Sequence, residues 1–142
     1  MTSTLAVVHL VVVAAYAGFQ WTVRALVYPQ FAEVTEGFAG YERAHQRRVT
    51  HVVGPLFVGQ GLTTVWLLVL AVRGTAPALP VLAGAACLAL VLGTTALGAV
   101  PQHRVLDRGW DAGAHRRLLR VDSVRTAAAT AHLVAAGWLV LA

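Results

Sequence analysis

The chain has 142 residues, the size of one domain, and 58% of them are hydrophobic while only 12% are charged. A soluble domain carries about 25% charged residues, so this composition argues against a water-soluble globule and against a disordered tail. The single cysteine argues against a disulfide scaffold, and so few charges cannot line a nucleic-acid duplex despite the net charge of +5.

Four apolar stretches each approach the roughly 20 residues that a helix needs to cross the hydrocarbon layer. They lie at 4–27, 49–72, 78–100 and 121–142. The stretches are continuous and rich in Ala, Leu and Val, and an open sheet cannot face lipid. We therefore expect an all-α fold, a four-transmembrane-helix bundle that forms a single domain over 1–142.

The charges predict the orientation of this bundle. Residues 24–48 hold four arginines and residues 104–125 hold six, whereas 49–103 contain Arg73 alone. Because arginine-rich loops stay on the cytoplasmic side, we expect two basic cytoplasmic loops and both termini outside. The first stretch lacks a basic leader, which favours a retained helix over a signal peptide. The sequence thus predicts a multi-pass protein of the bacterial inner membrane.

Polar residues inside a span must face protein or water, so their angular placement is informative. At 100° per residue, the fourth span gathers a polar set in one sector: His115, Asp122, Arg125, Thr126, Ala129 and His132. The second span has a similar set: Tyr41, His45, Arg48, His51, Pro55 and Thr63. The first span aligns His9, Tyr16, Gln20 and Arg24. We expect a bundle whose polar faces meet.

A transition-metal site is one interpretation of this interior. The candidate ligands are His45, His51, His103, His115 and Asp122, and the candidate metals are iron, copper and zinc. The spacings of His45 from His51 and of His115 from Asp122 do not suit one ion, so ligands would have to come from different helices. The alternative is a juxtamembrane network in which arginines pair with acidic residues.

Haem b is the weaker of the two cofactor interpretations. His9 and His132 are expected at similar depth, and pairs of transmembrane histidines ligate haem in bundles. For His9 alone, packing near the outer boundary is the simpler explanation.

Several short motifs follow one another in a familiar order. They are Tyr28-Pro29-Gln30-Phe31, Tyr41 with His45-Gln46-Arg47-Arg48, Val53-Gly54-Pro55, Pro101-Gln102-His103-Arg104, and His115-Arg116-Arg117-Leu118 with Arg125-Thr126. In this order the chain resembles a group of small bacterial four-helix membrane proteins of unassigned function, distantly similar to the anthrone-oxygenase-like membrane family. That likeness implies oxidation of a polyketide-type aromatic substrate.

The chain departs from the group's pattern in its interior. Where the group has Asn-Trp-x-Arg-Thr in its last span, this sequence has Asp122-Ser123-Val124-Arg125-Thr126. Gln60 stands where the group tends to have an acidic residue, and His51 stands where an aromatic or apolar residue is common. Relative to the group, the interior loses a bulky aromatic side chain at Ser123 and gains ionisable side chains at Asp122 and His51. These differences suggest an enlarged, specialised pocket.

These observations predict an integral membrane enzyme, an oxidoreductase or oxygenase acting on a lipophilic small molecule from a cytoplasm-facing pocket. His51 and Asp122 would be catalytic, and Arg48 and Arg125 would orient an anionic part of the substrate. Two alternatives remain, a small-molecule or ion carrier and a non-catalytic subunit of a membrane complex. The expected partners are membrane lipids, the substrate and a possible second copy of the chain, with no nucleic acid.

Overall fold

The structure, a computed structural model, describes residues 2–142 as four helical rods with no strand in that range. The first rod comprises α1 (Thr2–Thr22), a π turn η1 (Val23–Val27), α2 (Tyr28–Gln30) and a 3-10 turn η2 (Phe31–Glu33). The second rod is α3 (Phe38–Val72). The third comprises α4 (Ala78–Thr94), a π turn η3 (Thr95–Ala99) and α5 (Val100–Leu106), and the fourth is α6 (Ala112–Leu141).

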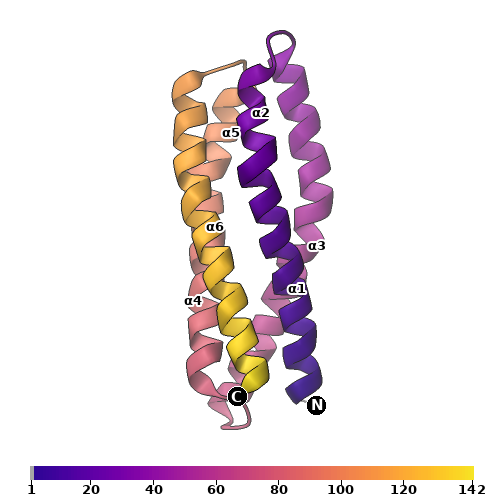
Figure 1. The fold of residues 1–142 in the computed structure, drawn as a ribbon, viewed down its shortest axis with the longest axis vertical. Helices are drawn as coiled ribbons and strands as arrows, with labels where there is room; N and C mark the ends of the chain where they lie inside the picture. Colours follow the sequence, from indigo (N-terminus) through magenta and orange to yellow (C-terminus); the bar gives the residue numbers. More distant parts are fainter. Residues whose placement is uncertain (1) are drawn as a thin grey trace.

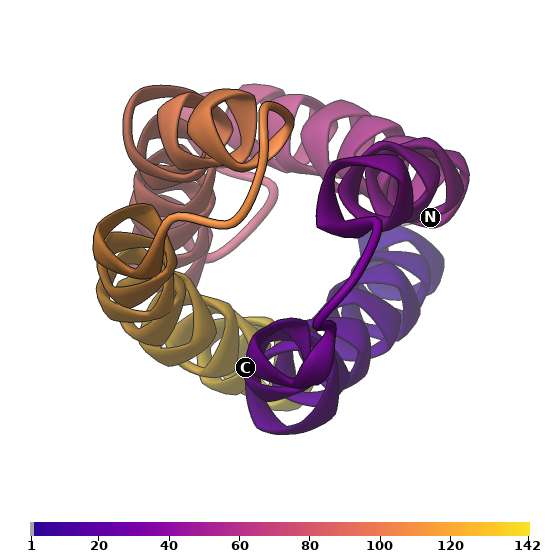
Figure 2. The same ribbon diagram turned by 90° about the horizontal axis from the view of Figure 1, so that it is seen from above.

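The rods run up and down beside one another and close into a ring (Figures 1 and 2). Neighbours around the ring are α1 and α3, α3 and α4, α4 and α6, and α6 and α1. Both termini and the turn at 73–77 lie at one end, and the loops at 34–37 and 107–111 lie at the other. We call the latter the basic end, because most of the arginines lie in the helices next to these loops.

All four rods are long and apolar enough to cross a membrane, which makes this a multi-pass membrane bundle. The candidate spans contain 31, 35, 29 and 30 residues. At about 1.5 Å per residue each rod exceeds the roughly 30 Å of the hydrocarbon layer. The helices therefore continue past the apolar stretches, and the surplus contains the arginine-rich segments of the basic end.

Local sequence explains where the rods bend and begin. Each π turn lies just before a proline near the start of the next helix, Pro29 in α2 and Pro101 in α5, since proline lacks the N–H that would continue the regular pattern. Gly37 adopts φ 65° at the entry to α3, a conformation that favours glycine. Asp111 caps α6 by accepting a hydrogen bond from the Ala114 amide at 2.6 Å.

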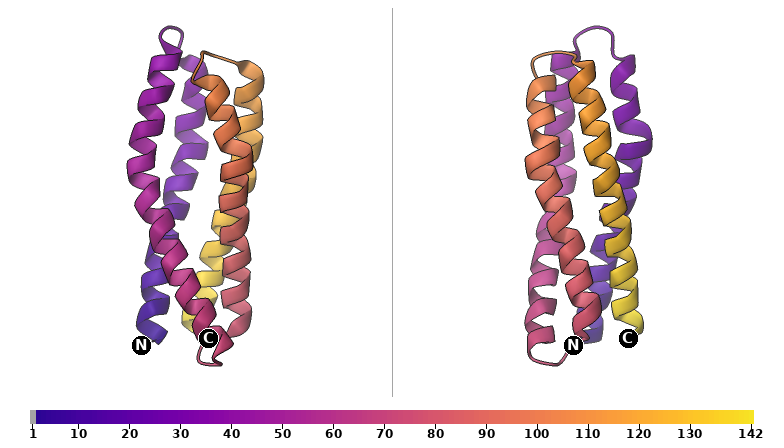
Figure 3. Two further views of the ribbon diagram at one scale, coloured as in Figure 1. Left: turned by 180° about the vertical axis from the view of Figure 1, so that it is seen from behind. Right: turned by 90° about the vertical axis from the view of Figure 1, so that its left-hand side faces the viewer.

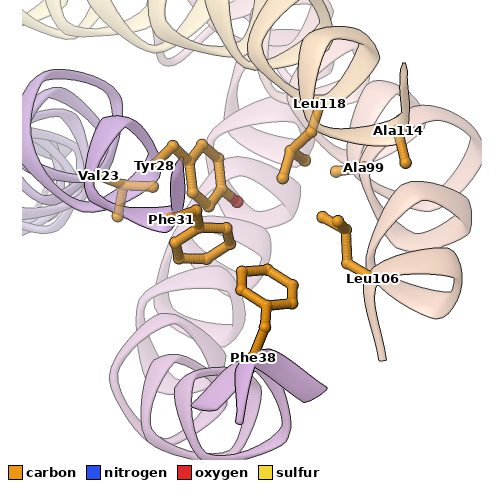
Figure 4. Close-up of a cluster of buried hydrophobic side chains, with 8 residues drawn as sticks. All are labelled: Val23, Tyr28, Phe31, Phe38, Ala99, Leu106, Ala114 and Leu118. Atoms are coloured by element: carbon orange, nitrogen blue, oxygen red, sulfur yellow. The ribbon is translucent and has the colours of Figure 1, made fainter. Parts of the chain in front are cut away.

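Three apolar clusters follow one another along the bundle axis. The cluster at the basic end joins the aromatic rings of Tyr28, Phe31 and Phe38 to aliphatic side chains of the third and fourth rods (Figure 4). Much of the outer surface is also apolar, and Leu62 and Val65 in α3 are 68% and 61% exposed. Such a surface is costly in water and suits contact with lipid chains.

Candidate functional site

The polar faces of the first and fourth rods meet in the interior, as the periodicity predicts, except that Arg24 is half-buried and lines a groove on the outside of the bundle. The buried polar residues of these two rods are His9, Tyr16, Gln20, Tyr28, His115, Asp122, Arg125, Thr126 and His132. The second rod differs from the expectation. Its buried polar face carries Glu42, Gln60 and Thr64, whereas Arg48 and His51 are exposed. Packing against α1 and α4 rotates α3 so that its arginines and His51 stay outside.

One hydrogen-bonded network joins the first and fourth rods near mid-bundle. Gln20 Nε2 donates to Asp122 Oδ1 at 2.6 Å, and the Tyr16 hydroxyl donates to Gln20 Oε1 at 3.1 Å. Arg125 Nη1 also donates to Asp122 Oδ1, at 3.3 Å. Within residues 2–142, the second oxygen of Asp122 and the Nε of Arg125 have no hydrogen-bond partner. Buried polar atoms without a hydrogen bond are uncommon in folded proteins, so these two atoms mark an unusual point of the interior.

A second network lies nearer the basic end and joins the first three rods. His103 Nδ1 and Glu42 Oε1 are 2.5 Å apart, and His103 Nε2 lies 3.1 Å from the Tyr28 hydroxyl. When Glu42 is ionised it must accept the Nδ1 proton, which leaves Nε2 to accept from Tyr28. Gln46 Nε2 donates to Glu42 Oε1 at 3.0 Å and to Asp107 Oδ1 at 2.7 Å. The result is an ordered chain of phenol, imidazole and carboxylate.

A pocket of about 350 Å³ adjoins both networks. Tyr28 and His103 line it from one network and Arg125 from the other. The remaining lining combines apolar residues such as Phe57 and Ala99 with polar or charged ones such as Thr95, Arg104 and Asp107. Most of its lining residues come from α3, η3 and α5 near the basic end. The left view of Figure 3 shows these rods from behind, diverging towards that end. A mostly apolar hollow with a few convergent polar groups is typical of a small-molecule site.

The structure does not gather the expected metal ligands. Within residues 2–142 no group of three His, Cys, Asp or Glu side chains could hold one metal ion. His51 is exposed and its Nδ1 contacts the Arg47 carbonyl oxygen at 2.6 Å. His115 Nε2 donates to the Tyr28 carbonyl oxygen at 2.8 Å. His45 packs its ring against Phe31 and lines the pocket.

The expectation that His9 and His132 share one depth is confirmed. Their Nε2 atoms are 3.3 Å apart, and His9 Nδ1 lies 2.8 Å from the Thr63 hydroxyl. Two imidazoles that ligate one haem iron bind from opposite faces of a flat macrocycle, which keeps their rings apart. Here the rings contact each other and the adjoining hollow has about 10 Å³, so the arrangement does not fit haem.

Sequence reasoning missed Glu42, Gln46 and the Tyr28 hydroxyl as parts of the site. Glu42 lies in a charged segment that resembles a solvated loop, yet its side chain is 0% exposed. One signal was present in the sequence, because Glu42 and Gln46 are four residues apart and share a helix face. Tyr28 belongs to the short motif Tyr28-Pro29-Gln30-Phe31, which by itself assigns no role to the hydroxyl.

Comparisons with protein-family models, with curated proteins and with solved structures find no match for this chain. The resemblance to anthrone-oxygenase-like proteins therefore stays a prediction.

Proposed function

We propose that this protein is an integral membrane enzyme that transfers a proton to or from a lipophilic small molecule bound in the pocket between α3 and α5. The observation that carries the proposal is the buried chain from Tyr28 through His103 to Glu42 at the wall of that pocket. An oxidation of the kind that the resemblance implies would need such a step together with a separate electron acceptor.

The chain has the organisation of a general base with an orienting carboxylate. A proton taken up through the Tyr28 hydroxyl passes to His103 Nε2, and the imidazolium that forms lies against Glu42. Glu42 in turn keeps its orientation through the Gln46 amide. Proton transfer by a positioned group of this kind contributes about 10²–10⁴-fold to a rate.

Arg125 supplies the positive charge that an anion would need. Arg125 lines the same pocket and belongs to the buried pair with Asp122. In a low-dielectric hollow, a preorganised donor stabilises charge that develops on a bound oxygen. The apolar wall suits the carbon skeleton of the substrate, so we infer a lipophilic molecule with one acidic or carbonyl oxygen.

The position of the pocket fits a substrate that reaches it from the bilayer. In the proposed orientation the basic end faces the cytoplasm of a bacterial cell and both termini lie outside. Tyr28 and His103 then lie just beyond the apolar stretches 4–27 and 78–100, at the level of the lipid headgroups. A lipophilic molecule there can keep its apolar part among the acyl chains while its polar oxygen reaches the site.

Deuterium exchange tests the proton-transfer step without knowledge of the whole reaction. The purified protein in lipid nanodiscs is incubated in D₂O with aromatic ketones that have two or three fused rings and an acidic C–H beside the carbonyl. Mass spectrometry follows the mass gain of each ketone. We expect catalysed exchange of at least one ketone, and a loss of roughly 10²-fold in that rate for Glu42→Gln and His103→Phe.

Two further variants separate chemistry from folding. His51→Phe alters an exposed histidine on the same helix as Glu42 and should leave the exchange rate unchanged. Tyr28→Phe retains the contact between His103 and Glu42 but removes the hydroxyl at the pocket wall. If no ketone exchanges faster than in empty nanodiscs, or if Glu42→Gln exchanges as fast as the wild type, the proposal is wrong.

A further inference from the structure

A groove separate from the pocket runs along the outside of the bundle between α1 and α6, which lie side by side in Figure 1. Its volume is about 860 Å³. Trp21, Arg24 and Ala25 line one side, and Ala127, Thr130 and Ala131 line the other. The surface is hollowed there because most of the side chains from α6 are small. It differs from the remaining outer surface of the chain, much of which is covered by large apolar side chains.

A hydrogen bond between the two walls shapes the floor of the groove. Trp21 Nε1 donates to Thr130 Oγ1 at 3.1 Å, and the Thr130 hydroxyl donates to the Thr126 carbonyl oxygen at 2.8 Å. The indole is therefore fixed across the space between the helices. Ser123 lies at the end of the groove near the basic loops, and its hydroxyl donates a hydrogen bond to the Leu119 carbonyl oxygen.

The length of the groove matches one leaflet of a bilayer. Its lining on α6 runs from Ser123 to Val134, which is about 16 Å at 1.5 Å per residue. Half of a hydrocarbon layer is about 15 Å thick. The groove therefore has room for an extended acyl chain along one leaflet.

Unpaired arginines mark the basic end of this groove. Arg24 lines the groove directly. Arg116 lies seven residues before Ser123 and Arg120 lies three residues before it, so both share its face of α6. The ion pairs within residues 2–142 are His103 with Glu42 and Arg125 with Asp122, so these three arginines pair with no acidic side chain. In the part of the chain that the structure describes, no acidic residue lines the groove. Its end near the basic loops is therefore positively charged.

We propose that the groove binds one anionic glycerophospholipid of the leaflet at the basic end. The phosphate would lie on Arg24 and Arg120, and one acyl chain would follow Ala127 towards Val134. Guanidinium groups bind phosphate oxygens through paired, charge-assisted hydrogen bonds. Basic hollows between transmembrane helices are suited to anionic headgroups. The proposal does not depend on the enzymatic function proposed above.

Lipid retention tests this assignment. The protein is reconstituted with equal amounts of phosphatidylglycerol and phosphatidylcholine, extracted into mild detergent and examined by native mass spectrometry. We expect one phosphatidylglycerol per chain to be retained in preference to phosphatidylcholine. Arg24→Gln and Arg120→Gln should each lower that preference about fivefold. Arg73→Gln, at the opposite end of the bundle, should leave it unchanged.

A second pair of variants tests the acyl-chain part of the site. Ala127→Leu fills the groove from an exposed position, and Ala89→Leu adds the same bulk to an exposed position on α4. Only Ala127→Leu should abolish retention. Equal retention of both lipids, or equal loss in both leucine variants, would overturn the proposal. So would a wild-type dimer that Ala127→Leu converts to monomers, because a second copy would then cover the groove.

Discussion

The buried pair of Asp122 and Arg125 gives the sharpest prediction about stability. Asp122→Ala removes a carboxylate that is 0% exposed and leaves the guanidinium of Arg125, which is 6% exposed, without its counter-ion. The same change takes the acceptor from the Gln20 amide. Arg125→Met removes the opposite partner, and the double variant removes both charges at once. These variants form a double-mutant cycle across one buried contact.

The expected loss of unfolding free energy follows from the burial of this pair. Removing one member of a buried ion pair costs about 3–5 kcal/mol, whereas replacing both by apolar groups is often close to neutral. Hydrogen bonds between membrane helices average about 0.6 kcal/mol, because the unfolded chain in a micelle finds other partners. We therefore expect the low end of the first range, about 3 kcal/mol for Asp122→Ala. The double variant should be more stable than Asp122→Ala.

Unfolding in mixed micelles measures these free energies. The protein in mild detergent is titrated with sodium dodecyl sulfate, and helix content is followed by circular dichroism for the wild type and three variants. Asp122→Asn is the matched control, since it retains an acceptor for Gln20 and should cost less than Asp122→Ala. Strict additivity of the two single changes would refute the argument that the charges are coupled.

Two further predictions concern packing and orientation. Gly98→Ala should destabilise the bundle by about 1–3 kcal/mol, because a Cβ there would lie 2.8 Å from Cγ1 of Val121. The control is Gly61→Ala, whose Cβ would meet no atom within 4 Å among the described residues, so its stability should not change. The same micelle titration measures both changes, and equal stability would contradict the packing argument. With the native cysteine replaced by serine, Thr75→Cys should react with a membrane-impermeant maleimide added to intact spheroplasts. Arg108→Cys should react only after permeabilisation, and the reverse pattern would invert the proposed orientation.

The helical periodicity of each segment, taken separately, predicts much of the candidate site. The buried face of the fourth rod follows from spacing alone, because residues such as Asp122, Arg125 and His132 recur in one sector of a helix. The same reasoning on the second rod selected Arg48 and His51, which are exposed. That rod has two polar faces near the basic end, and periodicity does not say which of them turns inward.

The sequence by itself determined that this is a four-span membrane protein, and which faces of its first and fourth helices are buried. Hydropathy and helical period are local quantities, so neither needs the tertiary fold. Only the tertiary structure brought Glu42 to His103, 61 residues later, and His103 to Tyr28, 75 residues earlier. The rotation of each helix about its own axis depends on how side chains of all four rods pack together. This packing buries the carboxylate of Glu42, although its segment resembles a charged loop in the sequence.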